Sequence, residues 1–478
     1  MVAFCLRCWP FLLLRLNQVV HGRATDPCGD LEVDPTSAGD NEVNGILENT
    51  SGTVVVTGGS GFIGSNLVEL LLKRTNYKIR VLDNLETGNI LYLDLISQPE
   101  RLQFHFGDIL DLPLLEKVFG VAEDDAARPG DDDAARPRPP PDIVGVFHLA
   151  AASKVLPSLI DPKMATFNVK NNALGTANLL EVVRKVILRQ EEWRKKHTTD
   201  ENHRSNQMDD NLYRFKKIVY AGSSTYYGRQ SADDIGAFEE NMLFSVSSPY
   251  AASKYMGELQ MNTFDEIHQV PTVNLRFFMV YGPRNPRKGG YAVVTGIFAE
   301  LKKAGTPLTI EGDGMQYRDF VHVEDVGRAC LLALENPSVR GTSINIGSGR
   351  THTILDAAEI VAPGETRRFL PARRNDLKGT LANTCKAKKE LKFASAKQFE
   401  AEMDFLVQKI LRNDNGDFVY ENMDRTFQRW FATKSPADGA PPWSSSSLEE
   451  KNERVRERIV KQGLLKAALE TTADAAEL

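Results

Sequence analysis

A glycine-rich stretch near residue 60 constrains the fold of this chain more than any other feature. It reads Thr57-Gly58-Gly59-Ser60-Gly61-Phe62-Ile63-Gly64 and directly follows the apolar run Val54–Val56. After it, Leu67, Leu70 and Leu71 have the spacing of one apolar helix face. Glycines at such a junction allow a tight turn, bring the backbone close to a pyrophosphate, and leave helix N–H groups facing the phosphates. The stretch therefore predicts a dinucleotide site; the alternative is a glycine turn without a ligand.

An acidic residue, Asp83, stands at the end of the next predicted strand. Its distance from the glycines, about twenty residues, is the spacing at which a carboxylate accepts a hydrogen bond from a ribose hydroxyl. Because a carboxylate repels a 2′-phosphate, Asp83 favours NAD over NADP. Two later strand ends, Gly107-Asp108-Ile109 and His148-Leu149-Ala150-Ala151, are expected to close over the adenine and nicotinamide halves. His148 alone is better explained as a histidine satisfied by its neighbours than as a chemical group.

Short apolar runs alternate with helical spacing along most of the chain. This alternation predicts βαβ units, a parallel sheet and right-handed crossovers. We expect an α/β fold, a Rossmann-type doubly wound parallel sheet with a smaller C-terminal substrate-binding lobe. The predicted strands are Val54–Val56, Lys78–Leu82, Phe104–Phe106, Val144–Leu149, Lys217–Ala221, Thr272–Phe277 and Ser343–Ile346.

A tyrosine and a lysine four residues apart, Tyr250 and Lys254, are the candidate catalytic pair. Four residues of helix place them on one face. A tyrosine with a pKa near 10 is a poor base at neutral pH, but a lysine cation beside it lowers that value. Ser223 lies at the end of the strand Lys217–Ala221, the end at which parallel sheets carry out chemistry, and can hydrogen-bond the same substrate oxygen. Turn bonding is the alternative role for this hydroxyl.

Composition excludes several other classes of protein. The chain has 478 residues, with 58 basic and 64 acidic side chains, and this balance does not indicate a nucleic-acid partner. Five cysteines, three of them within the first thirty residues, imply no disulfide framework. The Cys5-x-x-Cys8 pair lacks the second pair that a zinc site needs, so no metal is expected.

The chain divides into four parts by composition. Residues 1–50 are expected to be a targeting or disordered leader, because three arginines, a short apolar stretch and no acid precede a polar linker. We expect residues 51–278 to form the NAD-binding Rossmann domain, with insertions at about 121–141 and 189–211. Residues 279–400 are expected to form the substrate-binding lobe, with strands that return to the sheet, and residues 401–478 a partly helical extension. A secretory signal, a membrane anchor, a transit peptide and a disordered leader all remain open, so location stays open between cytoplasm and the secretory pathway or an organelle.

Between about Thr53 and Phe393 the sequence resembles the extended short-chain dehydrogenases/reductases, and among them the UDP-glucose/UDP-glucuronate 4-epimerase type of NAD-dependent epimerase/dehydratase. Beyond the phrases above, the resemblance rests on Ser223-Ser224-Thr225-Tyr226-Tyr227-Gly228, Pro249-Tyr250-Ala251-Ala252-Ser253-Lys254, Leu275-Arg276-Phe277-Phe278, Tyr281-Gly282-Pro283-Arg284 and Gly312-Asp313-Gly314-Met315-Gln316-Tyr317-Arg318-Asp319-Phe320.

This resemblance implies residue roles, an NAD cofactor, a nucleotide-sugar substrate that is a UDP-sugar, and a homodimer. It implies that Ser223, Tyr250 and Lys254 are catalytic, and that Ser223 and Phe278 contact the substrate. Arg318 and Arg373 would hold the diphosphate and Asp376 the ribose, in keeping with the affinity of arginine for phosphate oxygens. The NAD site would comprise Gly58, Gly61, Phe62, Ile63, Gly64, Asp83, Asn84, Asp108, Ile109, Leu149, Ala150, Asn172, Tyr250 and Lys254.

The chain departs from the family pattern at three places, all in the substrate half. Met279 stands where an Asn or Thr is usual, Asn375 replaces a glycine, and the stretch between Ile360 and Pro371 is short. Family dehydratases resemble one another in having Asp-Glu where this chain has Ser224-Thr225, and decarboxylases have a nearby glutamate. Without that second acid–base group, we expect a 4-epimerase that oxidises the sugar at C4 and then reduces it again. The alternatives are another nucleotide-sugar reaction (decarboxylation, dehydration or reduction) and a non-catalytic NAD-binding scaffold.

Overall fold

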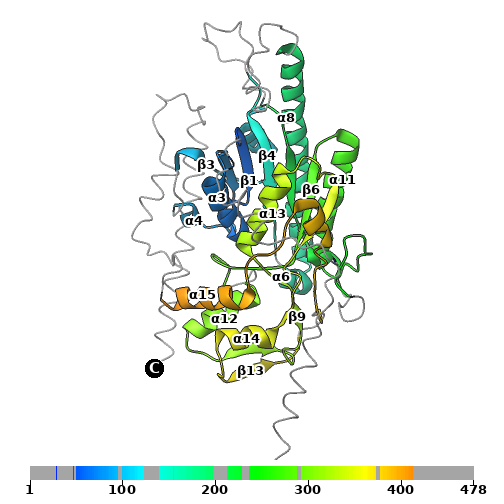
Figure 1. Cartoon of the computed structure of the whole chain (residues 1–478). Coiled ribbons are helices and arrows are strands. Elements are labelled where there is room, and N and C mark those ends of the chain that lie inside the picture. The colour runs from blue at the N-terminus through cyan, green and yellow to red at the C-terminus, as the bar shows by residue number, and fades with distance from the viewer. Residues whose placement is uncertain are drawn as a thin grey trace, which may run out of the picture.

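The computed structural model describes residues 28, 47, 50–94, 99–122, 139–153, 155–197, 213–228, 236–287, 292–372 and 377–412. At its centre lies a seven-stranded parallel sheet of order β11-β6-β5-β4-β1-β2-β3 (Figure 1). All seven strands coincide with the predicted runs, which confirms the fold class. They are β1 (Thr53–Thr57), β2 (Lys78–Asp83), β3 (Leu102–Phe106), β4 (Ile143–His148), β5 (Lys217–Ser223), β6 (Thr272–Phe277) and β11 (Thr342–Ile346).

Helices cover both faces of this sheet. Successive residues of a strand point to opposite faces of the sheet, so alternate side chains of β1 pack against different helix layers. Val54 and Val56 belong to one buried cluster with residues of α3 (Phe62–Arg74) and α13 (Val323–Glu335). Val55 belongs to another, with residues of α5 (Leu112–Phe119), α8 (Gly175–His197) and α11 (Pro249–His268). Both faces of the parallel sheet are therefore buried, as its apolar strands require.

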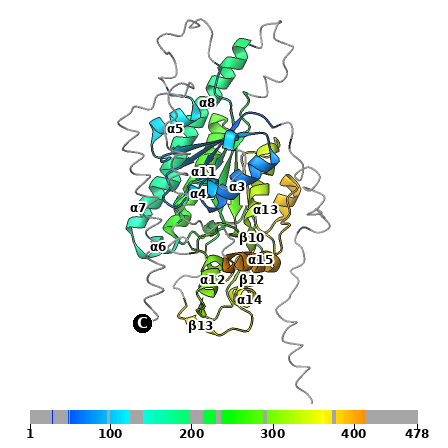
Figure 2. The ribbon, with the colours of Figure 1, turned by 90° about the vertical axis from the view of Figure 1, so that its left-hand side faces the viewer.

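A smaller lobe stands at one end of the sheet (Figure 2). It contains three two-stranded pairs, each too short to give a clear sequence signal. These pairs are β7 (Met279–Tyr281) with β10 (Phe320–His322), β8 (Leu308–Glu311) with β13 (Arg367–Leu370), and β9 (Tyr317–Arg318) with β12 (His352–Thr353). Its helices are α12 (Val294–Lys303), α14 (Ile354–Val361) and α15 (Phe399–Leu411). Because five apolar residues of α15 pack in the lobe core, this core continues past residue 400.

Short helices connect these layers. A π-helical turn, η3 (Lys170–Leu174), joins α7 (Lys163–Val169) to α8, and α6 (Val155–Ile160) precedes α7. The 3₁₀ turn η5 (Ser224–Tyr226) follows β5. Further short pieces are α4 (Leu91–Asp94), the 3₁₀ turn η1 (Pro99–Arg101) and the π-helical turn η6 (Ala387–Leu391).

The structure contains a disulfide, although the cysteine spacing implied no disulfide framework. Cys28 forms a disulfide with Cys385, 357 positions further along the chain. Cysteine spacing does not predict such a pair, because only the fold brings residues 28 and 385 together. Cys330 is a free thiol buried under the sheet.

Several expected segments lie wholly or largely outside the described residues. These are the leader apart from residues 28, 47 and 50, most of the insertion at 121–141, and the extension after residue 412. The insertion at 189–211 begins as a continuation of α8, which ends at His197. Among the described residues no helix is long and apolar enough to cross a membrane.

Candidate active site

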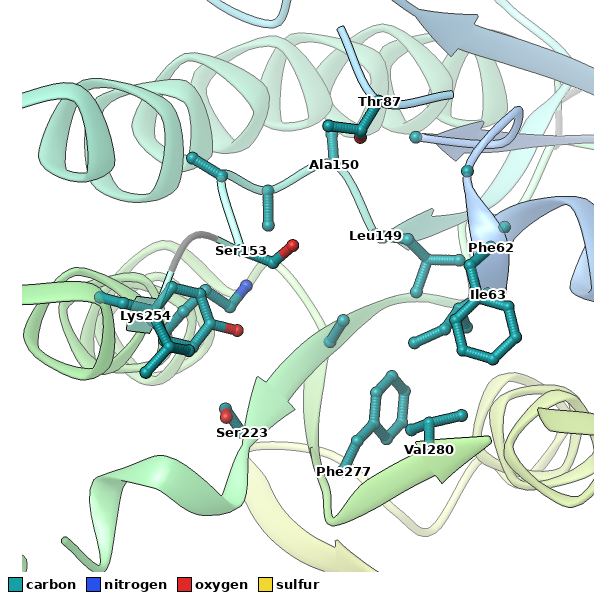
Figure 3. A pocket seen from close by; sticks show the side chains of 18 of the residues that line it. Phe62, Ile63, Thr87, Leu149, Ala150, Ser153, Ser223, Lys254, Phe277 and Val280 are labelled. Carbon is teal, nitrogen blue, oxygen red and sulfur yellow. The ribbon is translucent and has the colours of Figure 1, made fainter. Parts of the chain in front are cut away.

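A cavity of about 430 Å³ lies between the carboxyl ends of the sheet strands and the lobe. The strand ends of β1, β2, β4 and β5 contribute to its wall, and Phe278, Met279 and Arg318 border it from the lobe side. Figure 3 shows Ser223 and Lys254 on one side of this space and Phe62, Ile63 and Leu149 on the other. The carboxyl edge of a parallel sheet is where α/β proteins bind ligands.

The glycine turn makes up one end of the cavity and has no room for side chains. Gly58 has φ +72°, and a Cβ there would lie 2.8 Å from the amide nitrogen of Ala150. A Cβ on Gly64 would lie 2.1 Å from the carbonyl oxygen of Gly58. Helix α3 follows at once, and no side chain in the described part of the chain caps its N-terminal N–H groups at Gly61. The first turn of α3 is thus available to a phosphate.

The Asp83 carboxylate is held at the edge of the same turn. It accepts hydrogen bonds from the backbone N–H groups of Ser60 at 2.9 Å and Leu85 at 2.8 Å. Beside it, the Asn84 amide donates to the Asp108 carboxylate at 2.8 Å. Asp83, Asn84, Asp108 and Ile109 all border the cavity, as expected for the adenosine end of a dinucleotide.

Tyr250 and Lys254 lie on one face of α11, as their spacing predicts, and both border the cavity. Burial raises the pKa of Tyr250 to about 12, and the nearby Ser223 hydroxyl partly offsets this rise. Burial lowers the pKa of Lys254 to about 7, and the Glu258 carboxylate partly opposes this fall. Among the described residues the Lys254 ammonium has no hydrogen-bond partner. A buried, unpartnered ammonium costs free energy, so this position suits a bound ligand that supplies oxygens.

Ser223 ends β5 and starts the turn η5. Its hydroxyl accepts a hydrogen bond from the Thr225 N–H at 3.3 Å and lies 2.9 Å from the Thr225 hydroxyl. It caps the turn, as the alternative reading proposed, and it also borders the cavity. The geometry is compatible with both roles.

The predicted substrate contacts are only partly within the described residues. Phe278 borders the cavity, as does Arg318, whose guanidinium donates to the Leu377 carbonyl at 2.9 Å. Arg373 and Asp376 lie outside the described residues.

Asn172 is not among the residues that border the cavity. Its buried side chain accepts from the Ala152 N–H at 2.7 Å and donates to the Ala152 carbonyl at 3.1 Å and the Ser253 hydroxyl at 2.9 Å. It therefore joins the loop after β4 to the helix of Tyr250 and Lys254, behind the cavity wall.

His148 is satisfied by its neighbours, the reading that the sequence favoured. Its ring nitrogens lie 2.8 Å from the Thr57 hydroxyl and 3.0 Å from the Thr176 hydroxyl. Burial, together with the positive charge of Lys254, lowers the pKa of His148 to about 3. The imidazole is therefore neutral near pH 7.

Sequence reasoning missed the cavity residues that come from loops and from the short helix α7. They carry no periodicity or motif, and only the fold brings them to the cavity. Among them are Thr87, Ser153, Phe167, Val293, Leu377 and Thr380.

Residues 54–126 and 139–347 match the model of the "NAD dependent epimerase/dehydratase family". The chain belongs to this family. It is thereby an NAD-dependent enzyme of the epimerase type, which confirms the family and the cofactor expected from the sequence.

Individual relatives show how far the likeness extends. UDP-glucose 4-epimerase of Mycolicibacterium smegmatis is 29% identical over 344 residues, covering 70% of this chain and 91% of the relative. dTDP-glucose 4,6-dehydratase of Escherichia coli is 30% identical over 315 residues, covering 64% and 75%. The solved structure of a Bacillus cereus UDP-glucuronic acid 4-epimerase variant, with a fluorinated substrate analogue and NAD, is 29% identical with a TM-score of 0.59, covering 76% and 99%. Similar enzymes thus include both epimerases and dehydratases.

Proposed function

We propose that this protein is a UDP-sugar 4-epimerase that oxidises its substrate transiently at C4 and returns the hydride to the opposite face. The observation that carries the proposal has two parts. Tyr250 and Lys254 lie beside Ser223, and the two residues that follow Ser223 carry hydroxyls instead of carboxylates. Relatives named UDP-glucose and UDP-glucuronate 4-epimerase support the substrate class.

The residues present fit NAD. The uncapped N-terminus of α3 and the Cβ-free surface of Gly58 match a pyrophosphate, and the anchored Asp83 carboxylate matches a ribose. The Lys254 ammonium, which has no hydrogen-bond partner among the described residues, matches the hydroxyls of a second ribose. Bound NAD supplies reversible acceptance of a hydride.

Tyr250 takes the proton from the substrate C4 hydroxyl. Its raised pKa in the cofactor-free protein makes it a weak base, so its action depends on positive charge nearby. Lys254 supplies that charge one helical turn away. Ser223 hydrogen-bonds the same oxygen and stabilises the charge that develops on it.

Ser224 and Thr225 distinguish epimerisation from dehydration. A dehydratase must also remove and add protons at neighbouring carbons, which requires a second acid–base pair. Both positions border the cavity and carry only hydroxyls. A sugar ketone in this cavity is therefore limited to reduction, and its rotation before hydride return inverts C4.

We also propose a homodimer that uses α11 and the helices beside it. Apolar side chains are exposed there on neighbouring elements, with Ile160 74% exposed. Exposed apolar side chains that gather on adjoining helices indicate a protein contact. The residues concerned are Leu159, Ile160, Val169, Leu174, Met256 and Leu259. Light scattering should give twice the chain mass, and Leu259→Glu should give the monomer; a wild-type monomer at micromolar concentration would contradict the dimer.

The function is tested by incubating the purified protein with a panel of UDP-sugars without added cofactor. We expect one sugar pair to interconvert to an equilibrium mixture of C4 epimers, separated by chromatography and identified by NMR. A product that has lost water or carbon dioxide would contradict the epimerase.

A further inference from the structure

The Lys254 ammonium lies over the face of a buried aromatic ring. Its Nζ is 4.0 Å from the centroid of Tyr220, a fully buried residue of β5. A cation at this distance is attracted by the negative face of the ring, and the attraction is strongest where water is excluded. The contact involves the same ammonium that has no hydrogen-bond partner in the described part of the chain.

The hydroxyl of Tyr220 makes a second contact with the same lysine. It donates a hydrogen bond to the Lys254 carbonyl at 2.9 Å. This contact requires a glycine in the next turn of α11, because a Cβ on Gly257 would lie 2.3 Å from the Tyr220 hydroxyl oxygen. A glycine inside a helix is destabilising relative to alanine. At this position it leaves the space that Tyr220 occupies.

Other groups around the ammonium do not replace this contact. Glu258, on the same helix, raises the pKa of Lys254 from a distance, but its carboxylate is paired with Arg276 at 2.6 Å. On β4, His148 is neutral at pH 7, and its ring packs 5.6 Å from that of Tyr220. Burial raises the pKa of both Tyr250 and Tyr226, so these phenols are neutral at pH 7.

We propose that Tyr220 is a positioning residue for the reaction, whose ring keeps the Lys254 ammonium protonated and whose hydroxyl fixes that residue beside Tyr250. The inference rests on the proposed function for its catalytic consequence. If the ring attracts the ammonium less strongly, the pKa of Lys254 falls and the side chain loses its charge at a lower pH. Tyr250 then loses the cation that makes it a base.

The test replaces Tyr220 with phenylalanine and with its difluoro and trifluoro derivatives. Fluorine withdraws electron density from the ring face while the shape stays nearly constant. Tyr220→Phe should keep the alkaline limb of the wild-type kcat–pH profile. Each further fluorine should move that limb to lower pH, with kcat at pH 8 reduced roughly three- to thirtyfold for the trifluoro ring and with KM for the sugar unchanged. The same series at Phe298, buried in the lobe core, is the control and should leave the profile in place.

A second readout does not depend on turnover. Protein labelled with ¹³C at lysine Cε reports the Lys254 titration by NMR, with the signal assigned by its loss in Lys254→Met. We expect the titration midpoint to fall from Phe to trifluoro-Phe at position 220. An unchanged midpoint would overturn the inference even if the enzyme epimerises a sugar. If the midpoint falls but the protein converts no nucleotide sugar, the ring contact is supported and the proposed function is wrong.

Discussion

Arg276 and Glu258 form an ion pair at 2.6 Å in which both side chains are almost wholly buried. Arg276 lies on β6 and Glu258 on α11, four residues after Lys254, so the pair connects the sheet to the helix that carries Tyr250 and Lys254. The guanidinium also donates to the Tyr227 hydroxyl at 3.0 Å, and the Ser343 hydroxyl donates to Glu258 at 2.8 Å.

Removing one partner leaves the other charge buried without compensation. Arg276→Met should therefore lower the free energy of unfolding by about 3–5 kcal/mol, as measured by urea denaturation. The control is Lys185→Met, which removes a partly exposed pair with Glu116 and should cost less than about 1 kcal/mol. If both variants lose the same free energy of unfolding, the buried pair does not stabilise the packing of α11 on the sheet.

Gly64→Ala tests the glycine turn, because the new Cβ would lie 2.1 Å from the Gly58 carbonyl oxygen. The turn must shift, so we expect the wild type to purify with bound NAD and the variant to purify without it, as measured in the supernatant after denaturation. Gly305→Ala is the control, since a Cβ there has no atom of the described residues within 4 Å. It should retain the cofactor despite its positive φ. Full NAD occupancy in Gly64→Ala would contradict the predicted phosphate contact.

The strands and the central motifs were predictable because their signals are local. Strands buried on both faces of a parallel sheet appear as continuous apolar runs, and this pattern located all seven strands. The glycine turn and the Tyr250–Lys254 spacing are likewise contained in single segments. The lobe was predicted only as a region. Its paired strands are as short as Tyr317–Arg318, and α15 becomes part of a core only through residues distant in sequence.

The neutral state of His148 makes stability depend on pH. Its pKa in the folded protein is about 3, below the ordinary value near 6.5, so the unfolded chain binds the proton more readily. The stabilisation that the neutral imidazole contributes is complete above its pKa in the unfolded chain. It is lost as pH falls from about 6.5 toward 3. At pH 5 the loss is about 2 kcal/mol. The stability difference between pH 7.5 and 5 should shrink in His148→Gln but not in His268→Gln, whose side chain is exposed. An unchanged pH dependence in His148→Gln would contradict the buried neutral imidazole.

The disulfide between Cys28 and Cys385 should stabilise the protein by restricting the unfolded chain. Reduction by dithiothreitol should lower the free energy of unfolding by about 2–4 kcal/mol. Mass spectrometry of non-reduced peptides should recover residues 28 and 385 linked. The variant with serine at both positions should have the stability of the reduced protein and no response to dithiothreitol. A response that persists in this variant would assign the effect to other cysteines.

The most direct test of the account follows a deuterium atom at C4 of the UDP-sugar that the panel identifies. Hydride removal and return within one active site predicts that the inverted product keeps the deuterium at C4, in ordinary water and without added NAD. Tyr250→Phe, which loses only the hydroxyl, should slow the conversion by about a hundred- to ten-thousandfold. Product that has exchanged its C4 deuterium for solvent hydrogen, or a Tyr250→Phe protein as fast as wild type, would contradict epimerisation at the Ser223–Tyr250–Lys254 site.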